Sequence, residues 1–139
     1  MNFPYMIGNA EQIYLYGSRV YGTHREDSDF DHVVVMRPGT VKVDHMFNCD
    51  EHHYQVYSEE EWLIKIAQHD IMALECICLP DCFLSKKNAR NYFHDFKLNL
   101  NTLRESISTV SNHSWVKGKK KLNTTLFRSI GRASCRERV

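Results

Sequence analysis

Two short apolar runs joined by a polar loop constrain this chain more than any other feature. The first, Ile13–Tyr16, predicts a buried strand that stops at Gly17-Ser18, because glycine is a strong breaker of regular structure. The second is the β-branched run Val33–Val35, which predicts another strand directly after Ser28-Asp29-Phe30-Asp31. The chain therefore enters its second strand through two aspartates that are two positions apart.

Asp29 and Asp31 are predicted to point the same way, because side chains alternate between the two faces of a strand. At about 3.3 Å of rise per residue, their α-carbons lie roughly 6–7 Å apart. Two carboxylates on one face repel each other unless a cation lies between them. Oxygen ligands in this arrangement suit Mg²⁺, which typically takes one or two carboxylates together with substrate phosphates. The pair therefore predicts a Mg²⁺ site.

Gly17-Ser18 predicts a phosphate site facing that metal. A glycine between a strand and the next element lets backbone N–H groups approach an anion closely. If Ser18 starts a short helix through Tyr21, the N-terminus of that helix favours phosphate as well. A phosphate site facing a metal pair is suited to attack on a nucleoside triphosphate.

Gly-Ser, a spacer and then Asp-x-Asp on an apolar strand resembles the signature of the DNA-polymerase-β-type nucleotidyltransferase superfamily. Gly17–Thr23 followed by Asp27–Asp31 is most similar to a predicted nucleotidyltransferase branch common in bacteria and phages. The resemblance implies a Mg²⁺-dependent enzyme that moves a nucleoside monophosphate from an NTP such as ATP to an acceptor hydroxyl, with release of pyrophosphate. Asp29 and Asp31 would hold the metal, and Gly17 and Ser18 would hold the β- and γ-phosphates.

Three polar residues near this motif are further candidates for nucleotide binding. Arg19 and Arg25 can contact the triphosphate or face water, and Arg19 is the better candidate. Ser28 belongs to the predicted binding set, although its position suits bracing the loop better than reacting.

The resemblance also implies a third carboxylate on a later strand, where it would activate the incoming hydroxyl. This sequence departs from that pattern or hides it. The predicted strand His52–Tyr57 places His53 and Gln55 on one face, with Glu51 just before it. Glu51 is the predicted third acid. Alternatively, His53 acts as the base, or this protein has no residue in that role.

The rest of the chain predicts an α/β (α+β) domain with a small mixed sheet and helices packed on one face. Its 139 residues suffice for one domain with a core. We expect a nucleotidyltransferase core over residues 1–84 and a truncated helical portion over 85–130, following a lead-in over 1–12 of about one helical turn. The tail 131–139 has no periodicity and reads as translated sequencing-adapter sequence, so it is left out of the fold prediction.

Helices are expected after the sheet. Ser58 followed by Glu61 forms a capping box, and the helix that it opens should bury a stripe of apolar residues (Trp62, Leu63, Ile66 and Ala67). Asp70 can cap a helix over Ile71–Leu79, which must stop before Pro80. Ser85 or Asn88 should start the longest helix, because apolar residues then recur at three- and four-residue spacing as far as Val110.

Composition limits the partners. No apolar run is long enough for a membrane helix, no signal-peptide pattern opens the chain, and five cysteines without a secreted framework favour a reduced cytoplasmic setting. The Cys and His residues match no common zinc spacing, and the cysteines are predicted to be buried and inert. The lysine run 117–121 is ordinarily a solvated face, with contact to triphosphate or an RNA acceptor as the alternative.

Two classes of function remain open from the sequence. The first is the enzyme described above, with a protein side chain, RNA or a small molecule as acceptor. The second is a non-catalytic nucleotide- or partner-binding module, such as an antitoxin-like component, which the uncertain third carboxylate motivates.

Overall fold

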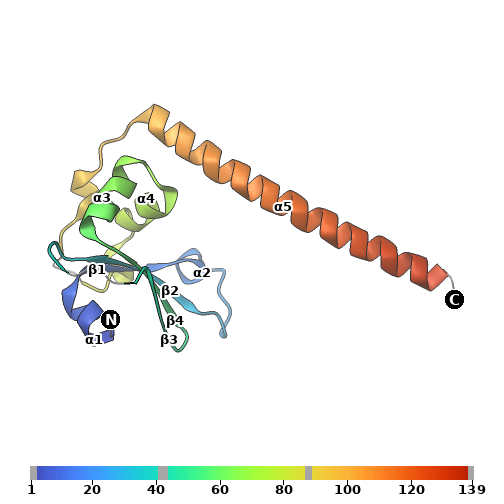
Figure 1. Ribbon diagram of the computed structural model, residues 1–139, viewed down its shortest axis with the longest axis horizontal. Coiled ribbons are helices and arrows are strands. Elements are labelled where there is room, and N and C mark those ends of the chain that lie inside the picture. Colours follow the sequence, from blue (N-terminus) through green and yellow to red (C-terminus); the bar gives the residue numbers. More distant parts are fainter. Residues whose placement is uncertain (1–2, 41–43, 87–88, 138–139) are drawn as a thin grey trace. The chain divides into compact units, whose positions relative to one another are not determined.

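The computed structural model describes residues 3–40, 44–86 and 89–137, with side chains up to Leu122. The chain divides into two compact units, Met1–Asn99 and Leu100–Val139. The first is a mixed α/β unit and the second is a single long helix (Figure 1). Its elements are, in order, α1 (Phe3–Asn9), β1 (Ala10–Tyr16), α2 (Ser18–Tyr21), β2 (Phe30–Met36), β3 (Met46–Cys49), β4 (His52–Tyr57), α3 (Glu59–Ala67), α4 (Ile71–Ile77), the 3₁₀ turns Asp81–Phe83 and Tyr92–Asp95, and α5 (Leu100–Glu137).

The four strands form one mixed sheet in the order β1-β2-β4-β3. β2 pairs antiparallel with β1 and parallel with β4, and β3 pairs antiparallel with β4. The register places Asp31 opposite Tyr16 on one side and opposite His53 on the other. The predicted mixed sheet is therefore confirmed, and its central strand is the one that carries the acidic motif.

Helices α3 and α4 cover one face of the sheet (Figure 1). Trp62 and Ile66 of α3 are buried against β-strand residues that include Val33 and Val35. The capping box is confirmed, since Ser58 Oγ accepts from the N–H of Glu61 and the Glu61 carboxylate accepts from the N–H of Ser58. Two details differ from the prediction: Ala67 is exposed, and α4 ends at Ile77 rather than Leu79.

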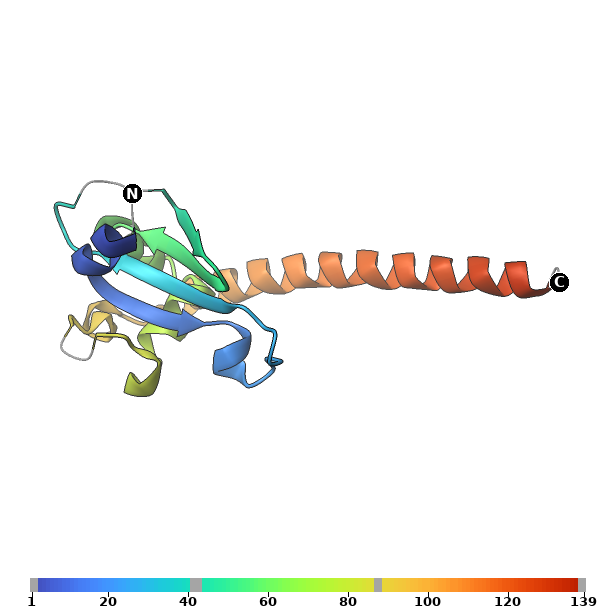
Figure 2. The same ribbon diagram turned by 90° about the horizontal axis from the view of Figure 1, so that it is seen from below.

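The opposite face is covered in part by α1, which Figure 2 shows lying against the sheet. Met6 is fully buried there, packed with Val34, Tyr54 and Val56. The expected lead-in over residues 1–12 therefore contains a real helix and the start of β1. The helix is only seven residues long, which is too short for a clear apolar period.

The segment after Leu84 differs most from the prediction. Ser85 does not start a helix: its N–H donates to the carbonyl of Ile13, and the long helix begins at Leu100. Asn88, the alternative start, lies outside the described residues. Tyr92 is buried in the core and Phe96 packs against it, so these two apolar residues fit the helical spacing without lying on a helix of that period. The later members of the pattern lie on α5.

Ionic contacts hold this segment in place. Arg90 pairs with the carboxylate of Glu59, which is buried, and its other guanidinium nitrogen lies 2.6 Å from Asp95. Residues 85–99 thus belong with the first unit, which ends at Asn99.

The loop after β2 begins with a turn at Arg37-Pro38-Gly39, where the N–H of Thr40 donates to the carbonyl of Arg37. β3 follows at Met46–Cys49, and residues 41–43 lie outside the described part. α5 continues through the tail to Glu137. Among the described residues, no helix combines the length and apolar character needed to cross a membrane.

Candidate active site

The bend after β1 depends on Gly17. Its backbone angles, φ 83° and ψ −148°, lie in a region that is essentially restricted to glycine. A Cβ atom placed on Gly17 would lie 3.0 Å from Oδ2 of Asp31. The bend therefore approaches the Asp31 carboxylate as closely as a residue without a side chain allows.

The bend leads directly into α2, whose first hydrogen bonds run from the N–H groups of Val20 and Tyr21 to the carbonyl of Gly17. The N–H groups of Ser18 and Arg19 precede these bonds, as first-turn donors do in any helix. Ser18 is the first helical residue and Gly17 is the N-cap, so the Ser18 hydroxyl does not cap this helix. The predicted short helix over 18–21 is confirmed, and its first donors lie beside the glycine that faces Asp31.

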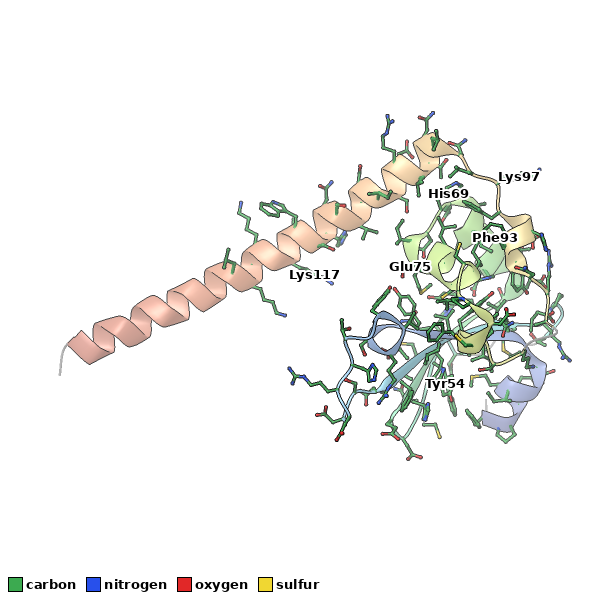
Figure 3. The ribbon with its side chains drawn as sticks, turned by 180° about the vertical axis from the view of Figure 1, so that it is seen from behind. Tyr54, His69, Glu75, Phe93, Lys97 and Lys117 are labelled. Atoms are coloured by element: carbon green, nitrogen blue, oxygen red, sulfur yellow. The ribbon has the colours of Figure 1, made fainter. Side chains whose placement is uncertain are left out.

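Helix α2 is also tied to α4. The hydroxyl of Tyr21 donates to the carboxylate of Glu75, which Figure 3 labels on α4. Burial, followed by the hydrogen bond to Glu75, raises the pKa of Tyr21, so this phenol is a neutral donor. The contact fixes the element that follows the bend against the helical layer.

Asp29 and Asp31 lie at the N-terminal end of β2 with exposed side chains. Asp31 alternates with Val33 and Val35 and so belongs to the face that α3 and α4 cover further along the strand. Asp29 Oδ2 lies 3.1 Å from Nε2 of His53, which is the β4 partner of Asp31. The parallel β2–β4 pairing thus brings one histidine next to both aspartates.

His53 occupies the position on β4 where the third carboxylate was sought. Its Nδ1 lies 2.8 Å from Oδ1 of Asn48 on β3, so both ring nitrogens have partners. Glu51 lies in the turn between β3 and β4 and is exposed; its backbone carbonyl accepts from the N–H of Phe30 at 2.8 Å. The described contacts include none between the Glu51 carboxylate and either aspartate. The structure therefore brings His53 to the acidic pair, and Glu51 as third acid stays a prediction.

Arg19 and Ser28 hold the loop that connects α2 to β2. The Arg19 guanidinium lies 3.7 Å from the centroid of the Phe30 ring and donates to the carbonyl of Ser28 at 2.8 Å. Ser28 Oγ in turn accepts from the N–H of Arg25 at 2.7 Å. These contacts lie within the loop and its anchor, so bracing is the role that the geometry supports; contact of Arg19 or Ser28 with triphosphate remains a prediction.

We expect Arg19→Ala to lower the free energy of unfolding by about 1–2 kcal/mol, because it removes a cation–π contact and a side-chain hydrogen bond to the backbone. Urea unfolding would measure the change. Arg25→Ala is the matched control: Arg25 is exposed and contributes its backbone to the loop, so its loss should cost less than about 0.5 kcal/mol. Equal effects of the two substitutions would contradict the bracing role of Arg19.

Two histidines support the same strands from the opposite face. The Phe30 ring stacks on His52, and His32 stacks on Tyr54, which Figure 3 labels on the sheet face opposite α3 and α4. His32 Nε2 lies 2.9 Å from His52 Nδ1, so one ring donates and the other accepts. Burial, and then the proximity of His52, lowers the pKa of His32 to about 4.

The depressed pKa of His32 predicts loss of stability in mild acid. Between about pH 6.5 and 4 the unfolded chain binds a proton at His32 that the folded protein does not, so stability falls by up to about 3 kcal/mol over this range and levels off below it. Urea unfolding from pH 7 to 4 would measure the slope. His32→Phe should reduce the dependence of the free energy of unfolding on pH, whereas His94→Gln, at an exposed site, should not. The same pH dependence in both variants and in the unsubstituted protein would show that His32 is not the group responsible.

The described cysteines differ in exposure. Cys76 is buried, and burial raises the pKa of its thiol. Cys49, Cys78 and Cys82 are exposed, so the expectation of buried cysteines holds for Cys76 alone among the described four.

The acidic pair suits a Mg²⁺ site whose coordination shell is completed by substrate phosphates and water. Within the described part of the chain, no group of three or more His, Cys, Asp or Glu side chains converges as a self-sufficient metal site. Two exposed carboxylates, of which Asp31 lies beside the glycine bend, would supply hard oxygen ligands and leave the remaining positions to water and phosphate. The donor set therefore matches the substrate-dependent class of Mg²⁺ site.

Comparison with known proteins agrees with this geometry. Residues 7–98 match the model of a family described as nucleotidyltransferase domain. Searches of curated proteins and of solved structures found no significant match. The match begins in α1, ends just before α5 and contains the bend, the acidic pair and β4. With about two thirds of its length matched, this chain belongs to the nucleotidyltransferase domain family.

Proposed function

We propose that this protein transfers a nucleoside monophosphate from an NTP to an acceptor hydroxyl, with Mg²⁺ as cofactor and pyrophosphate as the second product. The observation that carries the proposal is that a Cβ atom placed on Gly17 would lie only 3.0 Å from Oδ2 of Asp31. A phosphate-binding bend and a metal-binding carboxylate have to lie this close if one metal ion is to meet both.

Each residue of the site has a role in this proposal. The N–H groups of Ser18 and Arg19 bind phosphate oxygens at the start of α2. Asp29 and Asp31 would hold Mg²⁺, which when bound neutralises charge on the phosphates and on the leaving pyrophosphate. His53 keeps the Asp29 carboxylate oriented, because its other ring nitrogen is anchored on Asn48.

The reaction forms a bond from the acceptor oxygen to the α-phosphorus and breaks the bond from that phosphorus to the pyrophosphate oxygen. The hydroxyl proton passes to a base, for which Glu51 is the candidate. His53 is the alternative and would first have to release Asp29 or Asn48, because both of its ring nitrogens are held. The acceptor class, protein, RNA or small molecule, and the nucleotide base are left to experiment.

A second candidate function is supported by one specific observation. The β4 position opposite Asp31 carries a histidine, and the nearest carboxylate in sequence, Glu51, lies in an exposed turn. A site with two acids can hold metal and nucleotide without activating an acceptor. The protein would then be a nucleotide- or partner-binding module of the antitoxin-like kind.

One experiment separates the two functions. The protein is incubated with Mg²⁺ and each α-labelled NTP, with cell extract as acceptor, and label transfer and thermal stabilisation are measured together. Transfer to any component supports the enzyme. Stabilisation by an NTP without transfer supports the binding module, and the absence of both would refute both.

A further inference from the structure

The charges of this protein are divided between its two units. Residues 1–99 contain nine Lys and Arg against fifteen Asp and Glu, a net charge of −6. Without the tail 131–139, residues 100–130 contain six Lys and Arg against one Glu, a net charge of +5. No acidic residue occurs between Glu105 and Glu137. The near-neutral total therefore conceals an acidic domain joined to a basic helix.

Four lysines lie within five positions of this helix, at residues 117–121. Lys117 has lysines at both the third and the fourth following position, Lys120 and Lys121, where helices commonly carry an acidic partner. Like charges at these spacings destabilise a helix by a few tenths of a kcal/mol each. A bound polyanion would remove this repulsion.

The lysines also surround the helix instead of forming one stripe. At about 100° per residue, Lys117, Lys119, Lys120 and Lys121 cover roughly 200° of the circumference. All four are exposed, and Figure 3 shows the labelled Lys117 projecting from α5. Lys119 lies within about 60° of both Trp115 and Leu122, in the middle of the apolar side. A helix that lies in a membrane surface needs an apolar face without such a charge.

An aromatic side chain stands next to these lysines. Trp115 is 71 % exposed, whereas the other tryptophan, Trp62, is fully buried. Exposed aromatic rings beside cationic side chains are the combination that binds single-stranded nucleic acid, where bases stack and phosphates pair.

We propose that Trp115–Leu122 of α5 is a nucleic-acid-binding segment, in which the four lysines contact backbone phosphates and Trp115 stacks on a base. The ligand chemistry is a sugar–phosphate polyanion with accessible bases. The acidic first unit repels the same ligand, so contact concentrates on α5. The segment shares no residue with the proposed transfer site, so the inference does not rest on the proposed function.

Fluorescence anisotropy on the full chain tests the inference. Labelled 20-nucleotide RNA, DNA of the same sequence and the corresponding duplexes are titrated at 50–300 mM KCl. We expect the variant with Lys117, Lys119, Lys120 and Lys121 all replaced by Gln to bind at least tenfold more weakly at 100 mM KCl. Its log–log salt slope should fall by about 3, because four phosphate contacts are lost.

The control variant carries the same loss of charge elsewhere, by changing four exposed residues to Gln: Arg25, Arg37, Lys97 and Arg104. It should bind within about threefold of the unsubstituted chain. Trp115→Ala should weaken single-strand binding at least fivefold and abolish the ligand-dependent change in tryptophan emission, since Trp62 is shielded. Preference for RNA or DNA, single or double strand, identifies the source of the polyanion.

Three results would overturn the proposal. These are no binding of any nucleic acid at 50 mM KCl, equal loss of affinity in the lysine and control variants, and binding to phosphatidylserine-containing vesicles without binding to nucleic acid. Circular dichroism of each variant verifies that α5 is retained.

Discussion

Replacing Asp29 and Asp31 together by asparagine is expected to lower metal-dependent nucleotidyl transfer at least about a thousandfold, equivalent to about 4 kcal/mol of transition-state stabilisation. Asparagine keeps the size of the side chain but removes the negative charge that we propose holds Mg²⁺. Both side chains are exposed, so the fold should not depend on them. Removing two neighbouring like charges should leave the melting temperature unchanged or slightly higher.

Activity is measured as transfer of label from an α-labelled NTP. Stability is measured by thermal unfolding with and without Mg²⁺ and NTP. Asp27→Asn combined with Asp50→Asn is the matched control, because it removes two exposed carboxylates close in sequence to the same strands and should retain activity. Activity retained by the Asp29/Asp31 variant would remove the assignment of these residues.

Gly17→Ala is expected to reduce transfer by at least about a hundredfold and to lower the free energy of unfolding by about 1–3 kcal/mol. The methyl group would lie 3.0 Å from Oδ2 of Asp31, so the carboxylate must move away from the bend. The backbone angles of Gly17 are also unfavourable for any residue with a side chain. Transfer assays and urea unfolding measure the two consequences separately.

Gly22→Ala is a control that introduces similar backbone strain without placing a methyl group near Asp31. Gly22 also has a positive φ, 74°, but a Cβ there would meet no atom within 4 Å. It should therefore lower stability by about 1 kcal/mol and leave transfer within a few-fold of the original. If both glycine variants lose activity equally, the proximity of the bend to Asp31 is not what the site requires.

Much of the site could be predicted from the sequence because its signals are local. Gly17-Ser18 interrupts an apolar run, and Asp29 and Asp31 precede a β-branched one. Alternation along a strand then places the two carboxylates on one side without knowledge of the fold. The same reasoning found the capping box of α3, whose two hydrogen bonds join residues three apart.

What could not be predicted depends on long-range pairing. The position of His53 beside both aspartates follows from the parallel register of β2 and β4, which no local pattern specifies. The contact between Arg19 and Phe30 could not be predicted, because it depends on how the loop between these residues folds back to bring the guanidinium onto the ring. The spacing of Tyr92 and Phe96 fits a helix as well as it fits a 3₁₀ turn packed on the core.

The hydrogen bonds between Gln12 and Lys86 determine where the chain can be truncated without loss of the fold. Gln12 is almost fully buried in β1; its amide donates to the carbonyl of Lys86 and accepts from the N–H of the same residue. The Lys86 ammonium also reaches the carbonyls of Ile7 and Ala10. A truncation after Leu84 would leave the Gln12 amide and these carbonyls without their hydrogen-bond partners, whereas a truncation after Asn99 keeps these hydrogen bonds. Minimal fragments, split reporters and fusion junctions should therefore take Asn99 as the last residue of the nucleotidyltransferase domain.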